Sequence, residues 1–303
     1  MPKVSVIIPA YNAEKFIKNA IDSVLKQTFQ DFEIIIVNDC STDNTERVIF
    51  ENYKKEIEEG KIRYFRNEKN CCRTFTANKG AEEAKGEYLF FLDADDIWKE
   101  NHIESLLEEI EKPDVDIVYS LPRIFIDENG NIKRISKKKI EKDIDKIIFS
   151  SRIGFPSATA FKKKNFIFYD SECKYRGDIE LLIRARLNGQ KIKIVDTNTV
   201  MIREHNAPHR MSKTENFYKY TLRLHKIYMN KVPKKYRKYF LFHIGEIAFR
   251  FGDLSTGWKM VLKAIKENPA ILFDKYFLFS LLKRGFRIDR YIKRKMALAQ
   301  TSN

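Results

Sequence analysis

Three carboxylates lie within four residues, at Asp93, Asp95 and Asp96. They follow an apolar run at residues 86–92 that predicts a buried strand. Because like charges this close repel, a cation, hydrogen-bond donors or water must surround them. A metal of the Mg²⁺ type takes oxygen ligands and usually binds through one or two carboxylates plus substrate phosphates. The alternative is an Asp-rich turn that caps the next helix.

The segments before these carboxylates alternate between strand and helix patterns. Apolar, β-branched runs predict strands at 4–8, 32–37, 62–65 and 89–92, and apolar residues at helical spacing predict helices at 13–28, 45–59 and 74–85. This alternation predicts an α/β fold with a mostly parallel sheet. Ligands bind beyond the carboxyl ends of such strands, where Tyr11, Asp39 and Asp93 fall.

The rest of the chain is less regular. We expect a helix at 103–110, a strand at 115–120, a hairpin turn at 127–131, a helix at 178–187 and a strand at 192–195. Four further helices are predicted at 216–229, 235–251, 256–266 and 270–283. The composition changes near residue 212.

Five short motifs occur in a fixed order along the first part of the chain. They are residues 5–12 (SVIIPAYN), 37–43 (VNDCSTD), 77–80 (ANKG), 86–88 (GEY) and 91–96 (FLDADD). Together they resemble family 2 glycosyltransferases with the GT-A fold, over about residues 3–205. The resemblance implies a Rossmann-like catalytic domain at 1–211, a helical region at 212–303, and inverting sugar transfer from a nucleotide donor.

The resemblance also implies roles for the acidic cluster. Asp93-Ala94-Asp95 is similar to the family's DXD motif, which binds the donor and its metal. Asp95 would then coordinate Mn²⁺ or Mg²⁺, and Asp93 would contact the ribose or support the metal's water. Asp96 is expected to be a cap or a support.

By the same resemblance, other residues would bind the nucleotide. Asp39 matches the residue that accepts hydrogen bonds from the base in uracil-binding members, which suggests a UDP-sugar donor. Tyr11 would offer its ring to the base, beside Pro9 and Asn12. The alternatives are a turn or N-cap role for Asp39 and core packing for Tyr11.

Arg73 could reach the diphosphate. The alternative is a solvated surface arginine, since Ala77 stands where many relatives have an arginine.

Inversion requires a base that takes the proton of the acceptor hydroxyl. Asp178 matches the family's Glu-Asp signature at a helix start, although Gly177 replaces the Glu and leaves Glu180 as a substitute. The helix N-terminus should lower the pKa of Asp178, whereas burial would raise it. His205 falls where some relatives place a histidine near the metal, with a surface loop histidine as the alternative.

The formal net charge of +15 belongs to the last part of the chain, where residues 212–303 contain 21 Lys and Arg against 6 Asp and Glu. Basic, aromatic segments at 236–242 and 276–284 are typical of helices that lie on an anionic membrane surface. Many relatives use lipid-linked sugar acceptors, which agrees with this interpretation. A helical subdomain with a solvated basic face is the alternative, and no motif supports nucleic-acid binding.

Few cysteines, no leader-like start and no long apolar run predict a cytoplasmic protein, with the inner face of the cell membrane as a candidate surface. Glycosyl transfer by this protein would serve polysaccharide biosynthesis. Two other functions are alternatives. A nucleotidyltransferase would require a Gly-rich phosphate loop, which residues 9–12 lack. A non-catalytic membrane adaptor would use only the basic region.

Overall fold

The computed structural model describes residues 1–303 except 138–140, 152, 171, 173, 205–213 and 287–303. The chain forms two compact units, one of residues 1–144 with 153–210 and one of residues 145–152 with 211–303. The sequence predicts two separate domains, at residues 1–211 and 212–303. Whether these parts fold independently stays a prediction.

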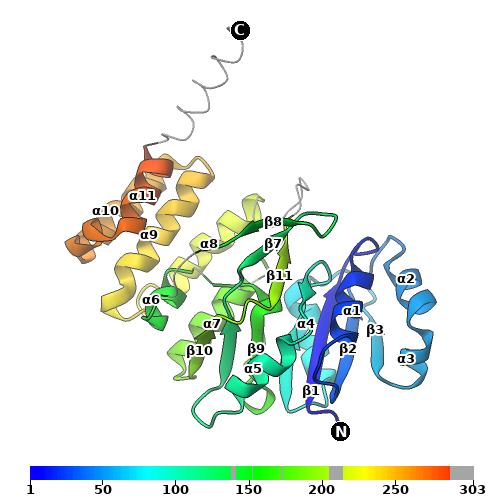
Figure 1. Ribbon diagram of the computed structural model, residues 1–303. Helices are drawn as coiled ribbons and strands as arrows, with labels where there is room; N and C mark the ends of the chain where they lie inside the picture. The colour runs from blue at the N-terminus through cyan, green and yellow to red at the C-terminus, as the bar shows by residue number, and fades with distance from the viewer. Residues whose placement is uncertain (138–140, 152, 171, 173, 205–213, 287–303) are drawn as a thin grey trace. The chain divides into compact units, whose positions relative to one another are not determined.

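A seven-stranded sheet organises the first unit, in the order β10-β6-β9-β4-β1-β2-β3 (Figure 1). Its parallel strands are β1 (Val4–Ala10), β2 (Phe32–Asn38), β3 (Ile62–Arg66), β4 (Tyr88–Phe91), β6 (Ile117–Ser120) and β10 (Ile192–Val195). β9 (Thr159–Lys162) is antiparallel to both of its neighbours and was not predicted. The expected mostly parallel α/β sheet is confirmed.

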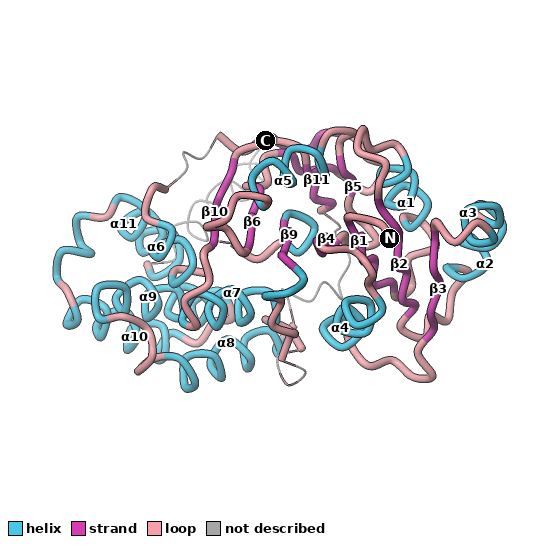
Figure 2. The backbone as a smooth tube through the Cα atoms, turned by 90° about the horizontal axis from the view of Figure 1, so that it is seen from below, coloured by secondary structure: helices cyan, strands magenta, loops and turns pink. Residues whose placement is uncertain are grey.

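Helices cover both faces of this sheet. Figure 2 shows α1 (Ile17–Leu25) and α5 (His102–Ile110) on one side, and α4 (Arg73–Glu83) and α7 (Gly177–Leu187) on the other. Successive strand residues point to opposite faces, so Phe90 packs against His102 of α5 while Phe91 packs edge-to-face against Tyr169. The expected helix at 45–59 is two helices, α2 (Thr45–Asn52) and α3 (Lys54–Glu58).

A four-stranded sheet, in the order β5-β11-β7-β8, completes the first unit. The predicted hairpin is present as β7 (Ile124–Ile126) and β8 (Ile132–Ile135). β5 (Ile97–Trp98) follows the acidic cluster directly and pairs with β11 (Val200–Arg203). Neither β5 nor β11 was predicted, and both prove important for the position of that cluster.

The second unit is helical, as expected. It contains α6 (Ile144–Phe149) from its second residue on, α8 (Glu215–Tyr228), α9 (Lys234–Arg250) and α10 (Leu254–Glu267). The single helix predicted at 270–283 is wrong: a 3-10 turn (Pro269–Phe273) precedes α11 (Lys275–Ser280) and a π-helical turn (Leu281–Gly285). The break lies at Asp274, whose carboxylate accepts the backbone N–H groups of Tyr276 and Phe277. Across the described ranges, no helix is both long enough and apolar enough to span a bilayer.

Candidate functional site

The ends of β1 and β2 bring the first predicted site residues together. Ala10 lies opposite Asn38 in the parallel register, and the Asp39 N–H donates to the Ala10 carbonyl at 2.8 Å. Pro9 is buried within β1. Tyr11, the next residue after β1, is 51% exposed, so the core-packing alternative for its ring is wrong.

Asn12 joins this edge to the loop after β2. Its backbone has a left-handed φ of 48°, a conformation that Asn tolerates better than most residues. Its backbone N–H donates to the Ser41 hydroxyl at 3.0 Å, and its side-chain oxygen accepts the Thr42 N–H at 2.9 Å. Asn12 therefore fixes the shape of the edge on which Tyr11 and Asp39 lie.

Asp39 is buried and organises the loop before α4. Its carboxylate accepts the Asn67 amide at 2.8 Å and the backbone N–H groups of Cys71 and Cys72 at 2.9 and 3.0 Å. It does not cap the following helix, since Asn44 is the N-cap of α2. A carboxylate has about four lone-pair positions, so three donors leave about one position for a ligand.

The acidic cluster is held by residues that sequence reasoning missed. The Ser157 hydroxyl accepts the Asp93 N–H at 3.0 Å and donates to the Asp96 carboxylate at 2.6 Å. The Arg203 N–H donates to the other Asp96 oxygen at 2.8 Å. Burial, together with the charges of Asp95 and Asp93, raises the pKa of Asp96 well above its usual range. Asp96 is thus a support of the cluster, as expected.

Arg203, on β11, ties the same loop from a second direction. Its buried guanidinium donates to the carbonyl of Asp95 at 2.7 Å and to those of Asp127 and Glu128 at 2.8 and 2.9 Å. The Asp95 side chain is partly exposed, whereas Ala94 is buried. No local sequence pattern indicates that Arg203 holds the acidic cluster. The single available signal is an arginine in a short strand late in the chain.

Arg73, the first residue of α4, bridges two of the predicted site residues. Its Nε donates to the Asp93 carboxylate at 2.7 Å, and its Nη1 donates to the Asp178 carboxylate at 2.9 Å. The third nitrogen, Nη2, is buried and has no hydrogen-bond partner within the described part of the chain. The alternative of a solvated surface arginine is therefore wrong.

Asp178 lies in the first turn of α7, as predicted. Burial raises its pKa above the usual range of an aspartate, although the Arg73 and Arg176 guanidiniums oppose that rise. Burial therefore outweighs the lowering expected from the helix N-terminus. Burial also raises the pKa of Asp93 to about 6, with Arg73 opposing it and the charges of Asp95 and Asp178 adding to it.

The glycine before Asp178 has a packing reason. A Cβ at Gly177 would lie 2.3 Å from the Thr74 Cγ2 atom, so any larger residue would force the Thr74 side chain to move. Glu180, the substitute base, is fully buried, and its two oxygens accept hydrogen bonds from Arg184 at 2.8 and 3.0 Å. It does not join the group formed by Arg73, Asp93 and Asp178.

Two further observations limit the site. His205 lies outside the described residues. Among the residues that the structure does describe, no three His, Cys, Asp or Glu side chains are arranged to hold a metal ion.

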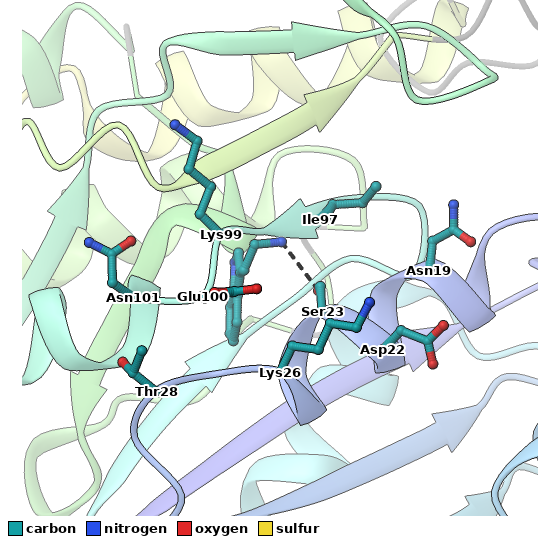
Figure 3. A pocket seen from close by; sticks show the side chains of 10 residues that line it. Asn19, Asp22, Ser23, Lys26, Thr28, Ile97, Lys99, Glu100 and Asn101 are labelled. Carbon is teal, nitrogen blue, oxygen red and sulfur yellow. Dashed lines mark hydrogen bonds between the residues drawn. The ribbon is translucent and has the colours of Figure 1, made fainter.

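A pocket of about 710 Å³ lies elsewhere, between α1 and residues 97–101 (Figure 3). Lys26, Lys99 and Glu100 are among its lining residues, and the Trp98 N–H donates to Ser23 at 3.2 Å across its base. None of the predicted site residues lines it. The candidate site is therefore identified by the polar residues at the ends of β1, β2 and β4, and not by the volume of this pocket.

Comparisons with known proteins agree with this fold. The Staphylococcus aureus protein TarS (residues 1–349), solved in complex with UDP-GlcNAc, is 19% identical with a TM-score of 0.63, and the match covers 97% of this chain and 92% of that one. The Pyrobaculum calidifontis mannosyltransferase PcManGT, solved with GDP-Man and Mn²⁺, is 14% identical with a TM-score of 0.58, and the match covers 100% and 87%. At these identities the likeness concerns the fold, which is GT-A.

The sequence comparisons reach further. An uncharacterized glycosyltransferase of Methanocaldococcus jannaschii is 32% identical over 233 residues, which cover 74% of this chain and 79% of the relative. The family profile described as glycosyl transferase family 2 matches residues 5–176, more than half of the chain. The nucleotidyltransferase and adaptor alternatives are thereby superseded. The chain is a glycosyltransferase that belongs to glycosyl transferase family 2.

Proposed function

We propose that this enzyme transfers a sugar, with inversion, from a UDP-sugar to a hydroxyl of a glycan or a lipid-linked sugar. Asp178 is the general base in this proposal, and Mn²⁺ or Mg²⁺ assists. The observation that carries it is the Arg73 bridge, because one guanidinium contacts both Asp93 of the DXD motif and Asp178. The donor-binding carboxylate and the base thus flank the same small space.

The nucleotide would bind at the ends of β1 and β2. Uracil has a single imide N–H, which suits the one lone-pair position left on Asp39. Guanine presents two adjacent N–H donors and would require two free positions. The exposed Tyr11 ring would stack on the base, with Pro9 and Asn12 fixing the backbone beneath it.

The diphosphate would bind between Arg73 and the DXD motif. A buried N–H donor without a partner is costly, so the Arg73 Nη2 atom favours a phosphate oxygen as its partner. Asp95, with Asp93 and Ala94 beside it, would hold the metal together with donor phosphates, and His205 stays a candidate ligand. The metal would stabilise the charge that develops on the leaving diphosphate.

On the acceptor side, Asp178 would take the proton of the attacking hydroxyl. The acceptor oxygen forms its bond to the anomeric carbon while the bond from that carbon to the diphosphate breaks, so the configuration inverts. The raised pKa of Asp178 makes it a stronger base than an exposed aspartate. Arg73 would hold the carboxylate toward the acceptor.

The acceptor and its location belong to the same proposal. A lipid-linked sugar would require the enzyme to work at a membrane, on its cytoplasmic face if the donor is a cytoplasmic UDP-sugar. Residues 212–303 contain 21 basic and 6 acidic residues, and this positive charge supports attraction to an anionic surface. The acceptors of this enzyme would then serve polysaccharide biosynthesis.

The test is a screen of UDP- and GDP-sugars for Mn²⁺-dependent release of nucleotide, followed by the Asp178→Asn variant on the active donor. We expect a UDP-sugar to be used and kcat to fall at least 100-fold in the variant, while the affinity for UDP changes less than threefold. Glu180→Gln is a poor control because Glu180 is buried and paired with Arg184, so Asp114→Asn, at an exposed aspartate, is preferred. A variant that retains near-wild-type turnover would show that the base lies elsewhere.

A further inference from the structure

The last described helical segment exposes apolar side chains together with lysines. Through α11 and the π-helical turn, the exposed residues recur at helical spacing and form one face. We call this the outer face of α11, and it consists of Lys275, Leu278, Phe279, Leu282, Lys283 and Phe286. Among these residues, Phe279 is 65% exposed.

The opposite side of the same segment is firmly packed. Phe277 and Ser280 are buried, and Phe277 lies against the Phe242 ring at 4.4 Å. Buried Glu246 on α9 accepts hydrogen bonds from Ser280 and from Tyr276. The outer face therefore belongs to an anchored helix, and its apolar residues are held outward.

Neighbouring segments extend this apolar surface. Phe273, in the 3-10 turn just before α11, is 87% exposed. At the other end, the Phe286 ring contacts Trp258 of α10 at 5.2 Å. Exposed Leu262 lies one turn further along α10.

The charges around this surface are positive. Lys275 and Lys283 lie on the outer face itself, and α10 exposes Lys259, Lys263 and Lys266. Asp274 is the one carboxylate in residues 269–286, and it is taken up by the N-cap of α11 and by Lys146 at 3.0 Å. The outer face thus joins apolar side chains with cations and no exposed carboxylate of its own segment.

The other basic, aromatic segment behaves differently. In α9, Tyr236, Phe240, Leu241 and Phe242 are all buried. These four side chains therefore belong to the core of the second unit, and Arg237, Lys238 and Tyr239 are the partly exposed residues of this stretch. Membrane contact by residues 236–242 stays a prediction.

We propose that the outer face of α11, together with Phe273, binds an anionic lipid bilayer. Its Phe and Leu side chains would enter the boundary between headgroups and acyl chains, and Lys275 and Lys283 would contact lipid phosphates. A second copy is a poorer partner, because a two-fold contact of this face with itself would gather the lysines of both copies in one interface with no carboxylate of the face to pair them. This inference rests on the proposed function, because a membrane-borne acceptor gives the enzyme a reason to bind a bilayer. The vesicle experiment itself does not depend on that acceptor.

The test is co-sedimentation of the full chain with phosphatidylcholine vesicles that contain 0 or about 30% phosphatidylglycerol. We expect binding to the anionic vesicles that weakens as salt rises. The Phe273→Ser/Phe279→Ser variant should bind at least tenfold more weakly. Lys275→Glu/Lys283→Glu should lose the preference for phosphatidylglycerol.

The matched control is Ile132→Ser/Ile135→Ser, which removes two residues of similar exposure, 60% and 58%, from β8. This control should bind vesicles as the wild type does. Circular dichroism and UDP-sugar hydrolysis, measured without vesicles, check the fold of every variant and report on the catalytic proposal separately. The inference is overturned if the wild-type protein does not bind anionic vesicles. It is also overturned if the Phe273→Ser/Phe279→Ser variant binds them as strongly as the wild type does. A wild-type dimer that the Phe variant converts to monomer overturns it as well, since the partner would then be a second copy.

Discussion

One arginine connects the two chemical halves of this site. Arg73 donates to Asp93 and to Asp178, and both carboxylates have a raised pKa because they are buried. Its positive charge opposes both of these shifts. Arg73 therefore sets how basic Asp178 is, besides holding its carboxylate in place.

A pH profile tests this electrostatic role. We expect the acid limb of kcat to lie above the usual aspartate pKa of about 3.9, because burial raises the pKa of Asp178. In Arg73→Gln the limb should move to higher pH, since removal of the cation favours the protonated acid. Steady-state kinetics between pH 4 and 9 measures the shift, with exposed Arg47→Gln as the control. A limb that moves to lower pH would contradict the assignment.

The motifs located the residues at the strand ends but not those that hold them. Tyr11, Asp39 and Asp93 follow strands that the apolar runs mark clearly. Ser157 and Arg203 carry no local pattern, because their roles depend on contacts with residues 61 and 107 positions away. The Arg73 bridge spans 105 positions and was equally invisible.

At the scale of elements, two short segments position the acidic cluster. The 3-10 turn Pro156–Ala158 supplies Ser157, and β11 supplies Arg203. Each segment is only three or four residues long, too short for periodicity to reveal. The antiparallel strand β9, which begins directly after this turn, was missed for the same reason.

Removal of the Ser157 hydroxyl tests this support. Ser157→Ala takes a donor from buried Asp96 and an acceptor from the Asp93 N–H, so we expect a loss of about 1–3 kcal/mol in the free energy of unfolding. UDP binding in the presence of Mn²⁺ should weaken as well. Urea denaturation and calorimetry measure both effects. Thr28→Ala, which removes an exposed hydrogen bond to Glu104, should change neither quantity measurably.

At the scale of the whole molecule, stability should depend on pH through a buried histidine. His102 is fully buried, its Nδ1 lies 2.7 Å from the Thr199 hydroxyl, and its ring stacks on Trp98 at 4.4 Å. Burial lowers its pKa to about 3, so the folded chain keeps it neutral. The unfolded chain binds a proton at this residue below about pH 6.5.

As the pH falls from about 6.5 toward 3, the unfolded state binds the extra proton, so the free energy of unfolding falls by up to about 1.4 kcal/mol per pH unit. His102→Gln should lose part of this slope, while its stability at pH 8 falls because the Trp98 stacking changes. Denaturation curves at pH 5, 6 and 8 provide the comparison. Equal slopes in both proteins would rule out His102 as their source.

The contact between Gly177 and Thr74 makes two distant sequence positions interdependent. A glutamate at 177, as the family's Glu-Asp signature has, would place its Cβ 2.3 Å from the Thr74 Cγ2 atom, so the Thr74 side chain, next to Arg73, would have to move. The same glutamate would be tolerated with glycine or alanine at 74. The residue at 74, next to Arg73, therefore restricts which residues position 177 can hold, although the two lie in different motifs.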